Sequence, residues 1–147
     1  MAFLEPASVI PYFGLRPNMH VADFGCGTGA YILDIARAVL PNGKVFAIDI
    51  QKDLLVNLKN TALEHNVRDL ELLWGDVETS GGSKLGDEMI DFALASNILF
   101  QTAGGYKVAL EIKRVLKPEA KVAVIDWSDS FGGLGPRPVD IVSKEAA

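Results

Sequence analysis

Cysteine is almost absent from this 147-residue chain, which contains Cys26 alone. A single cysteine cannot form an internal disulfide, and disulfides are typical of small extracellular domains. The first ten residues also lack the basic segment and long apolar stretch of a secretory signal. These two absences favour a cytoplasmic location. With only His20 and His65 beside the cysteine, the chain has too few ligands for a Cys/His zinc site, so no metal is expected.

An excess of positive charge and a long apolar run are missing as well. The 14 Lys and Arg residues face 19 Asp and Glu residues, for a net charge of −5, so nucleic acid is not an expected partner. No apolar run reaches the ~20 residues of a membrane-spanning helix. Hydrophobic residues make up 49% of the chain and charged residues 22%, which predicts one soluble globular domain covering residues 1–147.

Short apolar runs alternate with longer segments of helical periodicity along most of the chain. This alternation is typical of βαβ units and predicts an α/β fold with a parallel sheet. The five expected strands are residues 19–24, 44–50, 70–74, 90–95 and 121–127.

The intervening helices are predicted from apolar residues spaced i, i+3, i+4 and i+7. Three stripes have this spacing: Ile32, Ile35, Ala36 and Val39; Leu54, Leu55, Leu58 and Ala62; and Val108, Ala109, Ile112, Val115 and Leu116. Lys117-Pro118 should end the third helix, because proline cannot continue one. A short helix capped by Ser8 is expected ahead of the first strand, ending at Gly14.

The first predicted strand leads into the glycine-rich turn Asp23-Phe24-Gly25-Cys26-Gly27-Thr28-Gly29-Ala30, which precedes a helix. Glycine permits the sharp turn and a close approach of the backbone to a ligand, which also meets the N–H groups that begin the helix. Asp49 ends the second strand about twenty residues later, where a carboxylate can accept hydrogen bonds from both ribose hydroxyls. A glycine turn alone would be an ordinary βα connection, but together these features predict a site for a nucleoside-containing cofactor.

Asp23 helps to distinguish between the nucleoside-containing cofactors that could bind here. Gly25-x-Gly27-x-x-Ala30 also satisfies the relaxed dinucleotide fingerprint, so an NAD-dependent oxidoreductase is one alternative. A carboxylate two residues before the first glycine would repel a pyrophosphate and attract an ammonium or sulfonium group. This favours S-adenosylmethionine over NAD. A second possible role for Asp23 is to cap the N–H groups of the glycine turn itself.

The glycine turn with Asp23 and Asp49, together with Asp76 and the stretch from Lys117-Pro118 to Asp126-Trp127, resembles the class I S-adenosylmethionine-dependent methyltransferases. The similarity is greatest to the small-molecule branch that includes ubiquinone/menaquinone-type and arsenite-type enzymes, and it covers nearly the whole chain. It implies a Rossmann-like three-layer sandwich with parallel strands in the order 3-2-1-4-5. It also implies S-adenosylmethionine as cofactor, S-adenosylhomocysteine as product and a small-molecule methyl acceptor.

The resemblance also implies roles for individual residues. The methionine end of the cofactor would be held by Asp23 and the loop formed by Gly25, Cys26, Gly27, Thr28 and Gly29. Asp49 would bind the ribose, and Ile50 would pack on one face of the adenine. The family gives no reason to make Cys26 a nucleophile, since small residues are tolerated at that point of the loop.

Two further segments resemble motifs of the family. In Gly75-Asp76-Val77, Asp76 would accept a hydrogen bond from the exocyclic amine of adenine, and the Val77 N–H would meet a ring nitrogen. After the fourth strand, Asn97 would contact the ammonium group of the cofactor, with Ser96 beside it. The alternatives are that Asp76 only caps a turn and that Asn97 only caps a helix. No catalytic residue is assigned, because methyl transfer from a sulfonium can proceed largely by alignment of the two reactants.

Members of this family usually continue past the fifth strand with one more helix and two antiparallel strands, which the sequence does not contain. We therefore expect a C-terminally truncated core. Two interpretations remain open: a methyltransferase for a small acceptor, or a non-catalytic cofactor-binding subunit that needs a partner.

The fifth strand would then lie at the edge of the sheet. Val122, Ala123, Val124 and Ile125 would place apolar side chains on both of its faces, with no proline to discourage pairing. We therefore expect a homodimer through the strand that runs from Lys121 to Trp127, with residues 128–147 folding back over the edge as the alternative.

Overall fold

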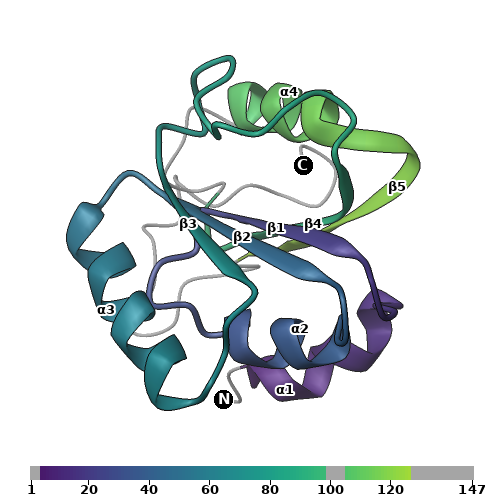
Figure 1. Cartoon of the computed structure of the whole chain (residues 1–147). Coiled ribbons are helices and arrows are strands. Elements are labelled where there is room, and N and C mark those ends of the chain that lie inside the picture. Colours follow the sequence, from purple (N-terminus) through teal and green to yellow (C-terminus); the bar gives the residue numbers. More distant parts are fainter. Residues whose placement is uncertain (1–3, 99–104, 127–147) are drawn as a thin grey trace.

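The computed structural model describes residues 4–98 and 105–126, which form a five-stranded sheet with helices on both faces (Figure 1). The strands are β1 (His20–Phe24), β2 (Lys44–Asp49), β3 (Leu70–Trp74), β4 (Ile90–Ser96) and β5 (Leu116–Ile125). The helical elements are α1 (Pro6–Val9), the 3-10 turn η1 (Ile10–Phe13), α2 (Ile32–Ala38), α3 (Lys52–Glu64) and α4 (Tyr106–Val115). None of the helices within these two ranges is long and apolar enough to cross a membrane.

The strand order is β3-β2-β1-β4-β5, and every neighbouring pair is parallel. The predicted α/β fold and the strand order implied by the family resemblance are therefore confirmed. From β1 the chain moves outward to β2 and β3, and then returns to the other side of β1 to form β4 and β5. Open sheets of this kind bind ligands where the direction reverses, at the carboxyl ends of the central strands.

Two apolar layers hold the helices to the sheet. On one face, α2 and α3 contribute Ile32, Ile35, Leu55 and Leu58 to a cluster that includes Val21 of β1. On the other face, Val108, Ile112 and Val115 of α4 pack with Phe24, Phe46 and Ile48. The central strands are covered on both faces, and this explains why they appear in the sequence as nearly continuous apolar runs.

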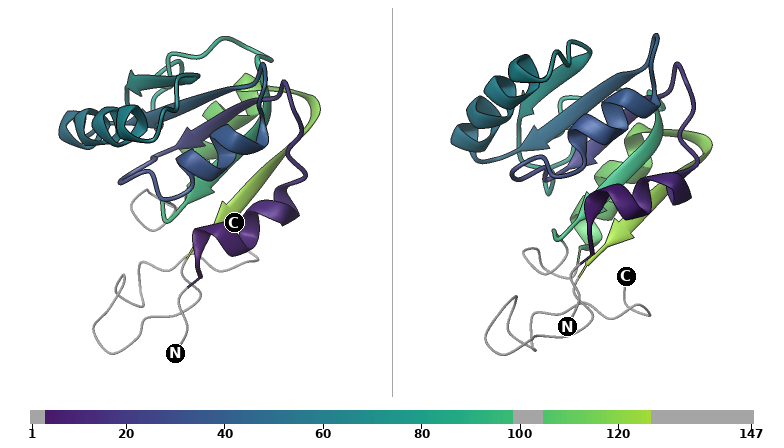
Figure 2. Two further views of the ribbon diagram at one scale, coloured as in Figure 1. Left: turned by 60° about the horizontal axis from the view of Figure 1, so that its bottom comes forward. Right: turned by 90° about the horizontal axis from the view of Figure 1, so that it is seen from below.

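The N-terminal segment extends the first of these layers toward β5. Phe13 of η1 stacks on Phe92 of β4 with ring centroids 5.1 Å apart. Ala123 and Ile125 of β5 pack against the same cluster. Both views in Figure 2 show α1 beside β5 at this end of the sheet. One face of β5 is thus covered by the chain's own first helical turns.

The structure corrects two details of the expected elements. The N-terminal helix begins at Pro6 because proline is favoured in a first turn, so Ser8 lies inside it and donates its hydroxyl to the Glu5 carbonyl at 2.7 Å. The other correction concerns β5, which begins at Leu116 and therefore includes Pro118. Regular pairing with β4 still starts at Lys121, opposite Phe92, after an irregularity between Ile90 and Phe92. Trp127 and residues 128–147 lie outside the described residues.

Candidate functional site

Two adjoining hollows lie at the carboxyl ends of β1, β2 and β4. The first, of about 360 Å³, is bordered by the ends of β2 and β3 and by the segment that follows β3. The second, of about 200 Å³, is bordered by the end of β1, the start of α2 and the end of β4. Gly25 and Gly27 line both hollows. An elongated ligand crossing the glycine loop would therefore occupy the two together.

Nearly all of the site residues expected from the sequence lie in these hollows. The first contains Gly25, Gly27, Asp49, Ile50, Asp76 and Val77. The second contains Asp23, Gly25, Cys26, Gly27, Thr28, Ser96 and Asn97. Gly29 lines neither of them, and a Cβ at this position would lie 2.5 Å from Leu58 Cδ1, so glycine here lets α3 pack closely.

Backbone hydrogen bonds hold the glycine loop in place. The N–H groups of Gly25 and Cys26 both donate to the Ile48 carbonyl at 2.9 Å. The Gly27 N–H donates to Asp49 Oδ2, also at 2.9 Å. These contacts attach the loop to the end of β2, so the loop and Asp49 form one unit.

Gly25 and Gly27 need glycine for different reasons. Both have positive φ, 71° and 55°. A Cβ on Gly25 would lie 2.4 Å from Ile98 Cδ1, so this glycine permits a close approach to a neighbouring side chain. A Cβ on Gly27 would meet nothing within 4 Å, because it would project into the open space of the hollows. Gly27 is therefore the residue whose missing side chain leaves room for a ligand.

Asp23 is a buried carboxylate with an unsatisfied oxygen. It lies between Ala47 of β2 and Leu94 of β4, and its exposed fraction is 2%. Asp23 Oδ1 and Ser96 Oγ are the two buried side-chain polar atoms of the described residues that have no hydrogen-bond partner, and both residues line the smaller hollow. Burial, with a smaller contribution from the charge of Asp49, raises the pKa of Asp23 to about 7. The alternative that Asp23 caps the glycine turn is not supported, since those N–H groups donate to Ile48 and Asp49 instead.

Asp49 is also buried, but both of its carboxylate oxygens already accept a hydrogen bond. Oδ2 accepts from the Gly27 N–H, and Oδ1 accepts from the Gln51 N–H at 2.9 Å. Each carboxylate oxygen has two lone pairs, so both oxygens can still accept a hydroxyl. Asp49 therefore shapes the loop in addition to the ligand-binding role expected for it.

Asp76 closes its own turn, as the simpler of the two alternatives predicted. Its Oδ1 accepts from the Glu78 N–H at 2.9 Å and its Oδ2 from the Thr79 hydroxyl at 3.2 Å. The side chain nevertheless lies on the larger hollow, beside the buried Val77. Capping and ligand binding are compatible here because a capped carboxylate keeps spare lone pairs. Asn97 does not cap α4, since the N-cap of that helix is Gly105.

Cys26 lies in surroundings that disfavour its thiolate form. Its side chain is buried, and burial together with the negative charges of Asp23 and Asp49 raises the pKa of the thiol far above its usual range. A thiol without thiolate character reacts poorly. Among the described residues there is also no group of three or more His, Cys, Asp or Glu side chains that could hold a metal ion.

Several lining residues were not predicted from the sequence. Gln51, Leu54 and Ile98 border the larger hollow, and Tyr31 borders the smaller one. Leu54 and Tyr31 follow strand ends at helix starts, a position that could have suggested them. Ile98 carries no such signal, because only its contact with Gly25 reveals its place.

Comparison with known proteins agrees with this geometry. Residues 15–142 match the family described as "Methyltransferase domain". The demethylmenaquinone methyltransferase of Lactococcus lactis is 28% identical over 122 residues, covering 83% of this chain and 47% of that protein. The protein of the same name from Staphylococcus aureus (strain JH9) is 32% identical over 122 residues, covering 82% and 48%. The chain thus spans about half the length of these curated relatives.

A solved structure is similar over a larger share of its length. The crystal structure of a SAM-dependent methyltransferase from Aquifex aeolicus superimposes with a TM-score of 0.83 at 30% identity, covering 95% of this chain and 72% of that one. The family match, the strand order and the arrangement of the glycine loop all point to one class. The chain belongs to the methyltransferase-domain family and has the Rossmann-like fold of the class I S-adenosylmethionine-dependent methyltransferases.

Proposed function

We propose that this protein binds S-adenosylmethionine across the two hollows and transfers its methyl group to a small-molecule acceptor. The observation that carries the proposal is the pair of unsatisfied buried atoms, Asp23 Oδ1 and Ser96 Oγ, in two residues that line the smaller hollow. Unsatisfied buried polar atoms cost free energy, so their persistence is explained if a ligand supplies their partners. An ammonium group satisfies a carboxylate and a hydroxyl at once.

The two hollows suit the two ends of the cofactor. The methionine end belongs in the smaller hollow, where its ammonium group meets Asp23, with Asn97 and Ser96 nearby. Its adenosine end belongs in the larger hollow, with the ribose at Asp49. The adenine ring then lies between the exposed side chain of Ile50 and the Asp76-Val77 turn.

The protein's own contribution to the reaction is orientation. When bound, S-adenosylmethionine supplies a methyl group on a cationic sulfur. The glycine loop and the two aspartates hold the cofactor in one position, and alignment of an acceptor with the methyl group can provide much of the rate enhancement. This mode of catalysis requires no catalytic base.

The test of this proposal is a calorimetric titration of the purified chain with S-adenosylmethionine, S-adenosylhomocysteine and NAD. We expect the first two to bind and NAD not to bind, because the buried carboxylate of Asp23 beside the loop repels a pyrophosphate. Binding of NAD alone would replace the proposal with the oxidoreductase alternative. Incubation with radiolabelled S-adenosylmethionine and quinone-type acceptors would then separate an active methyltransferase from a cofactor-binding subunit.

The homodimer expected from the sequence remains our proposal for the assembly. Within the described residues, β5 pairs with β4 on one side only. Val122 and Val124, on the α4 side of this strand, are 43% and 48% exposed and line a hollow of about 590 Å³ with Tyr106 and Ile112 of α4. Antiparallel pairing of β5 with a second copy would satisfy the free edge and cover these valines. Pro118 restricts this pairing to the part of the strand from Lys121 onward.

We expect light scattering at micromolar concentration to give twice the 15.8 kDa of one chain. Val124→Lys should convert the dimer to a monomer, because a charge in the middle of the paired edge blocks pairing. Val56→Lys, on the exposed face of α3, is the matched control and should leave the dimer intact. A mass of 15.8 kDa for the unmodified chain, or a dimer that survives Val124→Lys, would overturn the assignment.

A further inference from the structure

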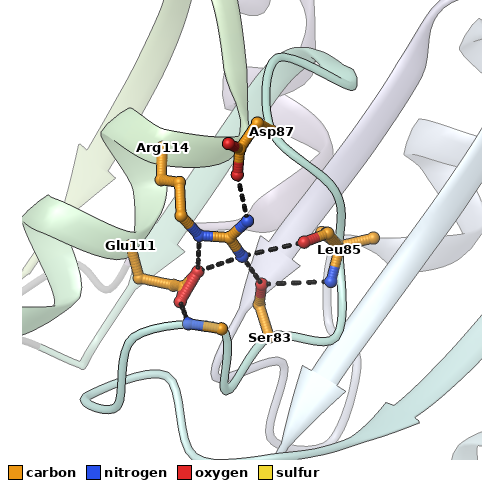
Figure 3. A network of polar contacts seen from close by, with 6 residues as sticks. Ser83, Leu85, Asp87, Glu111 and Arg114 are labelled. Atoms are coloured by element: carbon orange, nitrogen blue, oxygen red, sulfur yellow. Dashed lines mark hydrogen bonds and ion pairs between the residues drawn. The ribbon is translucent and has the colours of Figure 1, made fainter.

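An ion pair on α4, with one buried partner, holds the loop that follows the Asp76 turn in the chain (Figure 3). Glu111 has an exposed fraction of 2% and forms an ion pair with Arg114, one turn further along the helix. Figure 3 shows both side chains pointing from α4 into the loop that contains Ser83, Leu85 and Asp87. The Arg114 side chain is 26% exposed, but a buried carboxylate such as that of Glu111 is costly without a partner, so this geometry calls for an explanation.

The pair forms hydrogen bonds to several points of this loop. Glu111 Oε2 accepts from the Gly81 N–H at 2.6 Å. Arg114 donates to the Leu85 carbonyl at 2.8 Å and to Asp87 Oδ1 at 2.6 Å, and more weakly to Ser83 Oγ at 3.5 Å. The planar guanidinium group offers five donors in a fixed arrangement, so these contacts define the path of the loop.

This loop packs against the Asp76 turn so closely that the two backbones leave no room for a side chain between them. A Cβ on Gly82 would lie 1.8 Å from the Asp76 carbonyl oxygen, and a Cβ on Gly75 would lie 1.9 Å from the Gly82 carbonyl oxygen. The Gly82 N–H also donates to the Thr79 carbonyl at 2.8 Å, and the Thr79 N–H donates to the Asp76 carbonyl at 3.1 Å. A shift of Gly81 or Gly82 must therefore move Asp76.

We propose that Glu111 and Arg114 are positioning residues that set the selectivity of the site for adenine, acting through Gly81 and Gly82 on the Asp76-Val77 turn. This inference rests on the proposed function, in which that turn recognises the base. Neither residue lines the larger hollow. Their effect is on where the carboxylate of Asp76 and the N–H of Val77 are held, and hydrogen-bond selectivity depends strongly on that geometry.

The test uses the double variant Glu111→Leu/Arg114→Met. Removing Arg114 alone would leave the buried carboxylate of Glu111 unpaired, whereas replacing both partners by apolar residues of similar volume is often tolerated, so this variant should fold. Gly81 is exposed, so its N–H can bond to water once Glu111 is gone. Asp34→Leu/Arg37→Met is the matched control, because it removes an ion pair of the same i,i+3 spacing from α2, on the opposite face of the sheet.

The readout is the ratio of two dissociation constants, one for S-adenosylhomocysteine and one for its 6-deamino analogue, in which hydrogen replaces the exocyclic amine. We expect the unmodified chain to prefer S-adenosylhomocysteine by roughly tenfold or more, the scale of a hydrogen bond to a charged group. In the double variant the ratio should fall to about threefold or less, and amide exchange in residues 76–82 should accelerate. The control should keep both the ratio and the exchange rates.

The proposed function and the further inference would be contradicted by two different results. If S-adenosylhomocysteine does not bind the unmodified chain, the proposed function is wrong. If it binds with the expected preference and the folded double variant keeps that preference, Glu111 and Arg114 have only a structural role. Should the double variant prove unfolded by circular dichroism, Arg114→Lys supplies the same comparison, since it keeps the charge and loses the planar donor group. An unchanged ratio in folded Arg114→Lys would then overturn the inference.

Discussion

Asp23→Asn should weaken the binding of S-adenosylmethionine at pH 7.5 by roughly 10- to 100-fold, the range for loss of a hydrogen bond to a charged group. The unsatisfied Oδ1 of Asp23 is the atom that we expect to meet the ammonium group of the cofactor. Asparagine keeps the size of the side chain and removes its charge. The variant therefore tests the electrostatic contribution without opening a cavity.

Affinity in the unmodified chain should also depend on pH. Burial holds the pKa of Asp23 at about 7, so the free protein is largely protonated there at lower pH. A cation binds the ionised form, and binding must therefore displace a proton when the pH is below 7. Affinity should rise with pH up to about 7 and level off above it, and Asp23→Asn should remove that dependence. Calorimetry between pH 5.5 and 7.5, in two buffers of different ionisation enthalpy, measures both the affinity and the released proton.

The stability of the free protein should change with pH in the direction opposite to the binding affinity. The folded-state pKa of Asp23, about 7, lies above the ordinary value of 3.8, so the folded protein binds the proton more tightly than the unfolded chain does. Stability is consequently lost as the pH rises from about 4 to about 7, by an amount on the order of 4 kcal/mol. Asparagine removes this loss but leaves a buried amide unsatisfied, at a cost of about 1–3 kcal/mol. Above pH 7 we expect Asp23→Asn to be more stable by about 1–3 kcal/mol.

Chemical denaturation at pH 5 and pH 8 tests this second effect. The gain in the free energy of unfolding should be present at pH 8 and much smaller or absent at pH 5. A variant that is destabilised at pH 8 and binds the cofactor normally would show that Asp23 is an ordinary structural carboxylate.

Gly27→Val should abolish detectable binding of S-adenosylmethionine, with a loss of more than about 100-fold, while the domain stays folded. A side chain on Gly27 would project into open space between the two hollows, so it would occupy the volume of the ligand without striking the protein. The positive φ of 55° adds roughly 1–2 kcal/mol of backbone strain for any residue with a Cβ.

Gly14→Val is the matched control for that strain. Gly14 also has positive φ, 66°, and a Cβ there would likewise meet nothing within 4 Å, but Gly14 ends η1 and lines neither hollow. Both variants should lose a similar amount of thermal stability, and only Gly27→Val should lose binding. Equal affinities in the two folded variants would place the ligand elsewhere.

The parts of the fold that sequence reasoning predicted well are those governed by local patterns. The α2 and α3 stripes have helical spacing, and the apolar runs of β1, β2 and β4 mark strands buried on both faces, so the α/β class and most boundaries followed from periodicity. The start of β5 did not follow from periodicity. Proline disfavours helix continuation but is compatible with an edge strand, and only the pairing of Leu116 with Ile90 reveals that the strand begins there.

In the candidate site too, some features could be predicted from the sequence and others could not. Gly25, Gly27 and Asp49 indicated a nucleoside site through their residue types, their spacing and their positions at the ends of predicted strands. The contact that requires glycine at position 29 could not be predicted, because its neighbour Leu58 is distant in sequence. For Asp76, the sequence left capping and ligand binding as alternatives, and the structure placed the capped side chain on the wall of the larger hollow.

The sequence by itself therefore determined the fold class, the glycine loop and the family, because each depends on residue types and their spacing along the chain. Tertiary structure alone decided which polar atoms remain unsatisfied, why the pKa of Asp23 is raised and how Glu111 and Arg114 hold the loop beside Asp76. These properties depend on burial and on contacts between residues that are distant in the chain. Burial changes the free energy of a charge, and no one-dimensional pattern specifies which groups will share a buried space.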